Sequence, residues 1–308
     1  MEKIYDLIII GAGPAGITAS VYAARKRMDF IVVTGDVGGQ TVWTGDIENY
    51  TGYQFITGPD LAGKFDEHIK QYNIAVKENE EVTGLAKEDK IITVTTPKSV
   101  YRAKTVVVAS GKKAKELNVP GEQEYKNRGL TYCATCDGPL FAGKDVVIVG
   151  GGNSALEAAL QLTKIVKSIH MVNITEHLGG DAIVREKVTE SDIVTVMNNS
   201  QVTEVLGDTF VKGVKIKTGG EEKELKVDGV FVEIGLIPNS KFATELEKNE
   251  QGEIKVNCRN ETNVPGIFAA GDVTDVPEKQ IIIAAGDGAK AVLSAFKYIS
   301  GIAAKDWG

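Results

Sequence analysis

The stretch TYCATCDGPL, residues 131–140, holds the side chains with the clearest chemistry, because Cys133 and Cys136 are two residues apart and Asp137 follows directly. A C-x-x-C pair is a zinc clamp, a structural disulfide or a dithiol that opens and closes during a reaction. A zinc site needs further ligands, yet the third cysteine, Cys258, has no ligand-spaced histidine near it, so we expect no metal. In a reducing cytosol such pairs are rarely structural, and the pattern favours a redox dithiol.

Composition limits the classes of protein that can carry this dithiol. A chain of 308 residues, 43% hydrophobic and 25% charged, can bury two cores, so we expect two domains. The net charge is −7 and no long basic run is present, which argues against nucleic acid as a partner. The N-terminus does not resemble a signal peptide and no apolar run is long enough for a membrane span. We therefore expect a cytoplasmic protein.

The elements that must position the dithiol repeat one plan. The first copy predicts a buried strand at 7–10, a glycine turn, an alanine-rich helix and a second strand at 30–33. The turn reads G-x-G-x-x-G through Gly11, Gly13 and Gly16, a spacing that lets a backbone approach a pyrophosphate at a helix N-terminus. The alternative is a tight turn that binds nothing.

A second copy of this plan follows the C-x-x-C segment. It predicts a strand at 146–149, the turn Gly150, Gly152 and Ala155, a helix from about Ser154, and a strand that ends near residue 172. The two copies lie too far apart for one sheet with short connections. We therefore predict an α/β fold with two Rossmann-like dinucleotide-binding domains.

Several motifs together resemble those of the low-molecular-weight thioredoxin reductases. In the order and spacing of that family the chain contains GAGPAG, GGQ followed by IENY, YCATCDG, GGGNSALEAA and GIFAAGDV. The resemblance covers nearly the whole chain. It implies a discontinuous FAD domain at 1–113 and 240–308, with residues 114–239 inserted and carrying the C-x-x-C.

The resemblance also implies which residues bind FAD. The glycine turn would hold the pyrophosphate, Gln40 and Asn49 would lie beside the flavin, and Asp272 would bond the ribityl chain. The helix after Gln280 would point its N–H groups at the pyrimidine side of the flavin, where reduction develops negative charge. For Asp272 the alternative is a simple turn residue. The implied set is Gly11, Gly13, Pro14, Ala15, Gly16, Gly39, Gln40, Asn49, Gly271, Asp272, Lys279, Gln280 and Ile281.

For the dithiol, the resemblance implies that Cys136 meets the flavin, that Cys133 attacks the protein substrate, and that Asp137 shuttles the thiol proton. The competing role for Asp137 is a helix cap. Cys258 we expect to be a small buried or strand residue without chemistry. The family resemblance further implies thioredoxin as partner, a homodimer, and an insert that rotates between flavin and partner.

The chain departs from that family where NADPH would bind. Family members carry a histidine and arginines after the second strand of the insert, but this chain has Asn173, Ile174, Thr175 and Gly179 there. A 2′-phosphate would find no cation at these positions. The acid that binds a ribose in NADH sites should fall near Asn173, and Glu176 comes three residues later. NADPH is therefore doubtful, and the second glycine turn could be an inherited feature.

The missing motif resembles the ferredoxin-linked flavin thioredoxin reductases. Electron flow from a plant-type ferredoxin near −400 mV to thioredoxin near −270 mV runs downhill by about 6 kcal/mol for two electrons. We therefore expect ferredoxin as donor, with an ordinary NADPH- or NADH-dependent reductase as the alternative and a non-enzymatic flavin redox sensor as a further one. Trp43 and Trp307 could cover a free flavin face, or else Trp43 packs at an interface and Trp307 lies in the C-terminal tail.

Overall fold

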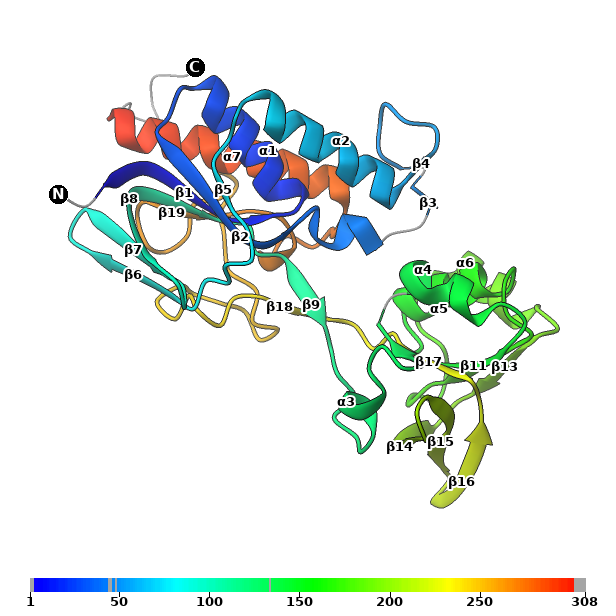
Figure 1. The fold of residues 1–308 in the computed structure, drawn as a ribbon. Coiled ribbons are helices and arrows are strands. Elements are labelled where there is room, and N and C mark those ends of the chain that lie inside the picture. The colour runs from blue at the N-terminus through cyan, green and yellow to red at the C-terminus, as the bar shows by residue number, and fades with distance from the viewer. Residues whose placement is uncertain (1–2, 44–45, 48, 133, 302–308) are drawn as a thin grey trace. The chain divides into compact units, whose positions relative to one another are not determined.

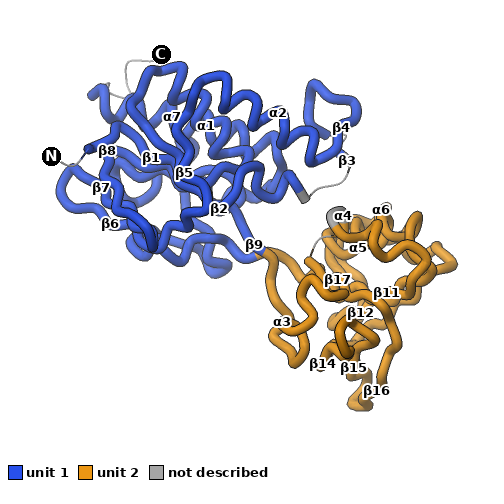
Figure 2. Tube along the Cα trace, viewed as in Figure 1, with its two compact units in different colours: residues 1–113, 237–308 blue, residues 114–236 orange. Residues whose placement is uncertain are grey.

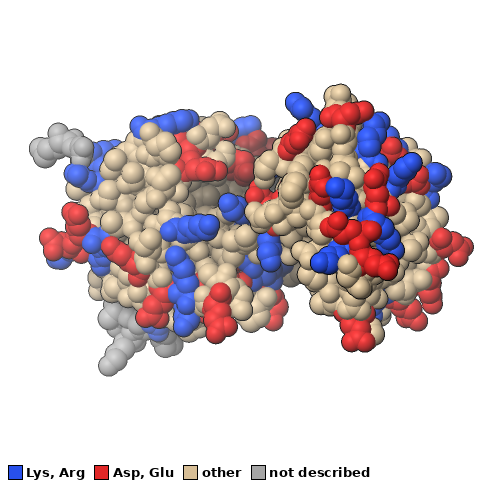
Figure 3. All heavy atoms as spheres, turned by 90° about the horizontal axis from the view of Figure 1, so that it is seen from below, with Lys and Arg blue, Asp and Glu red and all other residues tan. Residues whose placement is uncertain are grey.

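The computed structural model describes residues 3–43, 46–47, 49–132 and 134–301, without the side chains of residues 43, 46, 135 and 136. The chain divides into unit 1, residues 1–113 and 237–308, and unit 2, residues 114–236 (Figure 2). None of the described helices combines the length and apolar character that a membrane crossing requires. Acidic and basic side chains are interspersed on the face shown in Figure 3.

Unit 1 is built on a seven-stranded sheet in the order β5-β2-β1-β8-β7-β6, with β19 also paired to β8 (Figure 1). Strands β1, β2, β5, β8 and β19 run parallel, whereas β7 pairs with β8 in the antiparallel sense and β6 pairs with β7 in the antiparallel sense. The strands are β1 (Ile4–Ala12), β2 (Phe30–Val37), β5 (Val76–Lys77), β6 (Gly84–Glu88), β7 (Ile91–Thr95), β8 (Val100–Val108) and β19 (Ile267–Ala269).

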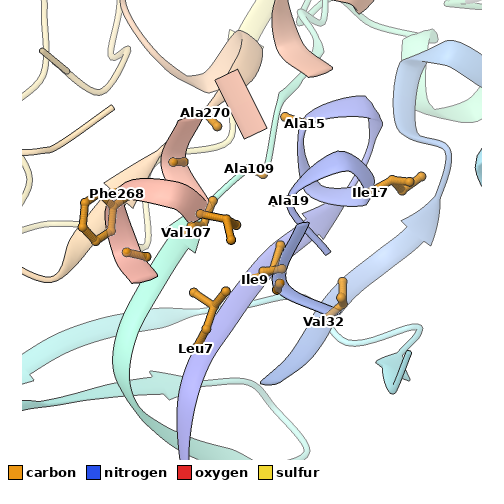
Figure 4. Packing of buried hydrophobic residues seen from close by; sticks show 14 of the residues in the cluster. Leu7, Ile9, Ala15, Ile17, Ala19, Val32, Val107, Ala109, Phe268 and Ala270 are labelled. Atoms are coloured by element: carbon orange, nitrogen blue, oxygen red, sulfur yellow. The ribbon is translucent and has the colours of Figure 1, made fainter. Parts of the chain in front are cut away.

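Helices and short segments complete unit 1. They are α1 (Pro14–Arg25), η1 (Gly39–Trp43), β3 (Asp46–Ile47), β4 (Ile56–Thr57), α2 (Gly58–Gln71), η3 (Gly271–Val273) and α7 (Ile281–Ser300). The buried residues of β1 contribute to the cores on both faces of the sheet, because successive side chains of a strand point to opposite faces. Leu7 and Ile9 pack with the alanines of α1 and α7 (Figure 4), while Ile8 and Ile10 pack into the core on the other face.

Unit 2 contains a parallel sheet and an antiparallel meander. The parallel sheet has the order β10-β17-β11-β12-β13, and the meander is β14-β15-β16. Its strands are β10 (Leu130–Thr131), β11 (Asp145–Val149), β12 (Ser168–Val172), β13 (Val194–Met197), β14 (Ser200–Gly207), β15 (Val211–Thr218), β16 (Glu221–Lys226) and β17 (Gly229–Val232). Its helices are α3 (Glu122–Tyr125), α4 (Ala134–Asp137), η2 (Gly138–Phe141), α5 (Asn153–Leu162) and α6 (Ala182–Thr189).

These elements confirm the predicted α/β fold with two Rossmann-like sheets. Each predicted strand–turn–helix–strand copy is present, and the helix predicted from about Ser154 begins at Asn153. The strands could be recognised because parallel strands that are buried on both faces form nearly continuous apolar runs.

The chain crosses between the units twice, through β9 (Lys112–Ala114) and β18 (Leu236–Pro238), which pair with each other. Next to this two-stranded ribbon, Asn239 is hydrogen-bonded to the residues that precede β9, a contact that we call the clasp. Its backbone N–H donates to Gly111 O at 3.0 Å, and its Nδ2 donates to Ser110 O at 2.9 Å. The Ser110 hydroxyl donates to Asn239 O at 2.7 Å. The second junction therefore lies at 236/237, before the residue 239/240 boundary expected from sequence, because Asn239 already bonds unit 1.

Candidate active site

The first glycine turn leads from β1 into α1 with little room for side chains. A Cβ on Gly11 would lie 2.3 Å from Ala109 O, and one on Gly16 would lie 1.9 Å from Gly11 O. Gly11 also has φ +101°, which favours glycine. Gly13, the N-cap of α1, contributes no side-chain cap, so the first N–H groups of the helix remain available to an anion.

A second loop meets this turn. Gly39 opens η1 with φ +55°, and a Cβ on it would lie 3.2 Å from Gly13 Cα. On the other side, Gly271 has φ +72°, and a Cβ there would lie 2.9 Å from Ala15 Cβ. Pro14 is the first residue of α1, where its missing N–H costs nothing. The backbone of three separate segments thus converges at the N-terminus of α1.

The other predicted FAD residues lie on η1, in the loop between β3 and β4, and at the start of α7. Asn49 Nδ2 donates to Gln280 Oε1 at 3.0 Å, which joins two residues far apart in sequence. Gln280 is the N-cap of α7 without a side-chain cap, and Ile281 begins the helix, so its first N–H groups are also available. Gln40 lies in η1 between Gly39 and the rest of that turn.

Two buried polar atoms in this region have no hydrogen-bond partner among the described residues: Thr41 Oγ1 on η1 and Asp287 Oδ2 on α7. Gly288, next to Asp287, approaches Ala15 so closely that a Cβ would lie 2.0 Å from Ala15 O. A cradle of glycines, two uncapped helix N-termini and unsatisfied polar atoms fit a dinucleotide with a pyrophosphate and a polar ring. The residues present therefore fit FAD.

Asp272, predicted to bond the ribityl chain, belongs to a charged cluster that the sequence did not reveal. Burial raises the pKa of its carboxyl, and the nearby Lys112 and Lys279 oppose that rise. Glu253 accepts from Lys112 Nζ at 2.9 Å, Lys279 Nζ at 3.0 Å and Asn249 Nδ2 at 2.6 Å. Burial opposes the charge of Glu253, but these bonds outweigh it and lower its pKa to about 2.

The dithiol segment lies in unit 2. Cys133 lies outside the described residues, and Cys136 lies in α4 with its side chain outside them. The Asp137 carboxyl accepts a hydrogen bond from the Thr131 hydroxyl. The alternative of a helix cap is wrong for Asp137, because its side chain makes no cap hydrogen bond to η2.

The segment meets the second glycine turn at Glu233, which sequence reasoning missed. The Ala134 amide donates a hydrogen bond to the Glu233 carboxyl. Glu233 N donates to Val149 O at 2.8 Å, and a Cβ on Gly150 would lie 2.1 Å from Glu233 O. The C-x-x-C segment and the turn after β11 thus lie at the same carboxyl edge of one parallel sheet.

The second turn retains the geometry of a dinucleotide site. Gly150 has φ +141°, α5 has no side-chain cap at Gly152, and a Cβ on Gly152 would meet nothing within 4 Å. The N–H groups at the start of α5 are therefore available to a pyrophosphate, as in unit 1.

The end of β12, where a ribose would be recognised, is different. Asn173 is buried, and its Nδ2 donates to Thr175 O at 3.1 Å and to Asn198 Oδ1 at 2.9 Å. Its Oδ1 accepts from Thr175 Oγ1 at 3.0 Å. The Asn173 amide is thus engaged within the protein rather than presented to a ligand.

One cation near this loop escaped the sequence analysis. Arg185 on α6 returns to the loop, where its Nη1 donates to Leu178 O at 3.2 Å. It borders a surface pocket of about 480 Å³ lined by His177, Leu178, Arg185, Thr189, Val196 and Asn198. Arg185 therefore lies near the loop after β12, although it comes later in the sequence than positions 173–179, where the cations of an NADPH site were expected.

Three other expectations concern single residues. Trp43 lies in η1 with its side chain outside the described residues, and Trp307 lies outside them entirely. Cys258 is exposed and lies in a turn, so the expectation of a buried or strand residue is wrong.

Residues 5–288 match the sequence profile of the pyridine nucleotide-disulphide oxidoreductases. The chain belongs to that family. A Bacillus subtilis member named NADH dehydrogenase is 42% identical over 301 residues, which are 97% of this chain and 59% of that protein. The chain thus spans about six tenths of the length of the curated relatives it matches.

Solved structures of this oxidoreductase family place the chain among proteins like thioredoxin reductase. A Lactococcus lactis thioredoxin reductase is 35% identical with a TM-score of 0.89, covering 97% of this chain and 100% of that one. A ferredoxin-flavin thioredoxin reductase from Clostridium acetobutylicum is 30% identical with a TM-score of 0.55, covering 98% and 100%. These likenesses support a flavoprotein with the thioredoxin reductase fold.

Proposed function

We propose that this oxidoreductase is a FAD-dependent disulfide reductase that uses NADH and reduces thioredoxin through Cys133 and Cys136. The observation that carries the proposal is the meeting of the C-x-x-C segment with an uncapped dinucleotide turn at Glu233. Bound FAD would supply the two-electron chemistry that connects a nucleotide to a dithiol. The thioredoxin reductases among its structural relatives support thioredoxin as the partner.

The roles of the dithiol residues follow from thiol chemistry. The Cys133 thiolate would attack one sulfur of the thioredoxin disulfide and release the other as a thiolate. Cys136 would then attack the mixed disulfide, which forms the Cys133–Cys136 disulfide and frees reduced thioredoxin. Asp137, which accepts from Thr131, would carry the thiol proton between these states.

The choice of NADH rests on charge. The sequence has no Lys or Arg at 173–179, so a 2′-phosphate lacks the paired cations that would balance its charge of about −2. NADH has no such phosphate, and the turn at Gly150 and Gly152 needs no cation to hold a pyrophosphate. The NADH dehydrogenase relative supports the same choice.

Reduced ferredoxin is the second candidate donor, and Asn173 favours it. The Asn173 amide is buried in internal hydrogen bonds, and no acid stands at the end of β12 to bind ribose hydroxyls. The likeness to the Clostridium acetobutylicum enzyme supports it as well. A ferredoxin donor would need no nucleotide site in unit 2.

Anaerobic reduction of the FAD-loaded protein distinguishes the donors. NADH, NADPH and reduced ferredoxin are offered separately while the visible flavin absorbance is followed. We expect NADH to bleach the flavin faster than NADPH. Bleaching by ferredoxin with both nucleotides inert would overturn the NADH assignment.

Cysteine variants test the dithiol. Cys136→Ser should leave a folded yellow protein whose flavin is reduced but which cannot reduce thioredoxin. The matched control is Cys258→Ser, which should keep full activity because Cys258 is exposed in a turn far along the sequence from the dithiol. Thioredoxin reduction that survives in Cys136→Ser would refute the relay.

A further inference from the structure

A short loop of unit 1, residues 249–253, is bonded to both crossings of the chain between the units. Glu253 Oε1 accepts from Lys112 Nζ at 2.9 Å, and Lys112 is the first residue of β9 in the first crossing. Gly252 O accepts from the Ser240 hydroxyl at 2.6 Å, and Ser240 directly follows the clasp residue of the second crossing. One loop of unit 1 therefore holds the chain where it leaves and where it returns.

The backbone of this loop is fixed by its own hydrogen bonds. Asn249 Oδ1 accepts from the N–H groups of Gln251 at 3.1 Å and of Glu253 at 2.9 Å. Gly252 N donates to Asn249 O at 3.0 Å. Asn249 Nδ2 donates to Glu253 Oε2 at 2.6 Å, so both oxygens of this carboxyl are bonded. The Glu253 carboxyl is thus held in one place between the loop and Lys112.

The same carboxyl is connected to the dinucleotide cradle through Lys279. Lys279 Nζ lies 3.0 Å from Glu253 Oε1 and donates to Thr274 O at 2.5 Å. The Thr274 hydroxyl donates to Gly271 O at 2.7 Å, which closes η3 around Asp272. Lys279 also directly precedes the N-cap residue of α7. One series of bonds therefore runs from β9 through Glu253 to two elements that form the cradle.

We propose that the ion pairs Lys112–Glu253–Lys279 couple occupancy of the dinucleotide cradle to the local stability of the two crossings. A ligand that fixes η3 and the start of α7 also fixes Lys279, which then holds Glu253 in place for Lys112. The crossings therefore open less often in the FAD-loaded protein than in the protein without FAD. The inference rests on the proposed function only in taking FAD as the ligand of the cradle.

Hydrogen–deuterium exchange measures this opening, and mass spectrometry resolves peptides that cover the two crossings. Two amides there report directly: Lys115 N donates to Gly235 O at 2.9 Å, and Asn239 N donates to Gly111 O at 3.0 Å. In the unmodified protein, saturating FAD should slow the exchange of these amides by about fivefold or more, the lower limit typical of coupling between two sites.

Variants of Lys112 separate the ion pairs from any direct contact between FAD and the crossings. Lys112→Met keeps an apolar stem but removes the charge, so FAD should slow these amides by less than about twofold. Lys112→Arg keeps a cation for Glu253 and should retain the full effect. The matched control is Lys113→Met, because Lys113 is exposed and its side chain points to the opposite face of β9. This control should leave the effect of FAD unchanged.

Two results would overturn the inference: FAD that binds without slowing exchange at the crossings of the unmodified protein, or full slowing that persists in Lys112→Met. Where Lys112→Met does not fold, Ser240→Ala decides in its place, because it removes the second bond to the loop without touching an ion pair. Unchanged slowing at the second crossing in that variant also overturns the inference.

The assay needs neither an electron donor nor thioredoxin. A protein that fails to reduce thioredoxin, yet shows slowing by FAD that depends on Lys112, therefore refutes the proposed function and supports the coupling.

Discussion

Glu253 gives the most quantitative prediction, because three hydrogen bonds hold its charge in a site where both ion-pair partners are well shielded. Glu253 and Lys112 are each 13% exposed, and Lys279 is 24% exposed. The lowering of the Glu253 pKa from 4.5 to about 2 corresponds to about 3 kcal/mol of folding free energy, at about 1.4 kcal/mol for each pH unit. Since the folded-state pKa is lowered, this stability is present above pH 4.5 and is lost as pH falls through 2.

The perturbation is Glu253→Gln, which keeps the shape but removes the charge. Relative to the unmodified protein it should destabilise unit 1 by about 3 kcal/mol at pH 7, plus a pH-independent penalty for leaving Lys112 and Lys279 without their partner. At pH 3 the pH-dependent part should fall to about 1.5 kcal/mol, because Glu253 is then close to its own pKa.

Urea unfolding followed by tryptophan emission measures this difference. Both tryptophans, Trp43 and Trp307, belong to unit 1, so the signal reports that unit and not the insert. Glu250→Gln is the matched control, because Glu250 is exposed in the same segment. A Glu253→Gln penalty that stays constant between pH 7 and pH 3 would refute the electrostatic reasoning.

Two further predictions use the glycine turns and the loop after β12. The Gly13→Ala variant should fold normally, because the added Cβ comes no closer than 4.0 Å to Gly39 Cα. It should nevertheless bind FAD more weakly in equilibrium dialysis. Gly63→Ala, where a Cβ meets nothing within 4 Å, is the control and should bind FAD as the unmodified protein does. Equal FAD affinity in both would contradict the pyrophosphate assignment. The double variant Ile174→Arg/Gly179→Arg should tighten NADPH binding by about tenfold or more, since each charge-assisted bond contributes about 1.5–3 kcal/mol. Both arginines can be accommodated, because Ile174 is 68% exposed and a Cβ on Gly179 would come no closer than 3.6 Å to Gly151 O. If the NADPH affinity of the double variant is unchanged, the 2′-phosphate does not bind at this loop.

The strands and turns could be predicted because their signals are local. Gly11 and Gly150 each follow an apolar run, and a backbone with positive φ pressed against a carbonyl tolerates little else. The α7 helix was recognisable from its apolar sequence beginning at Ile281. Such features depend on residues within a few positions of each other, which a sequence displays directly.

The charged contacts could not be predicted, because they depend on tertiary structure. Lys112 and Glu253 are 141 residues apart, and no spacing rule connects them. Glu233 follows an ordinary buried strand, and its contact with the Ala134 amide joins residues that are 99 positions apart in the sequence. At Asn173 the sequence showed that an acid was missing, but only the structure shows that the amide is bonded internally. Arg185 reaches the same loop because α6 turns back.

The clasp between Asn239 and residues 110–111 has an evolutionary consequence. The chain leaves unit 1 and returns to it at neighbouring residues, which are joined by the bonds between Ser110 and Asn239. With respect to unit 1, the whole of unit 2 is therefore an insertion in a single loop. The entropy of closing a loop grows only with the logarithm of its length, so exchanging a short loop for a complete domain there costs unit 1 little. A gene segment inserted at this point adds a function without breaking the sheet of its host.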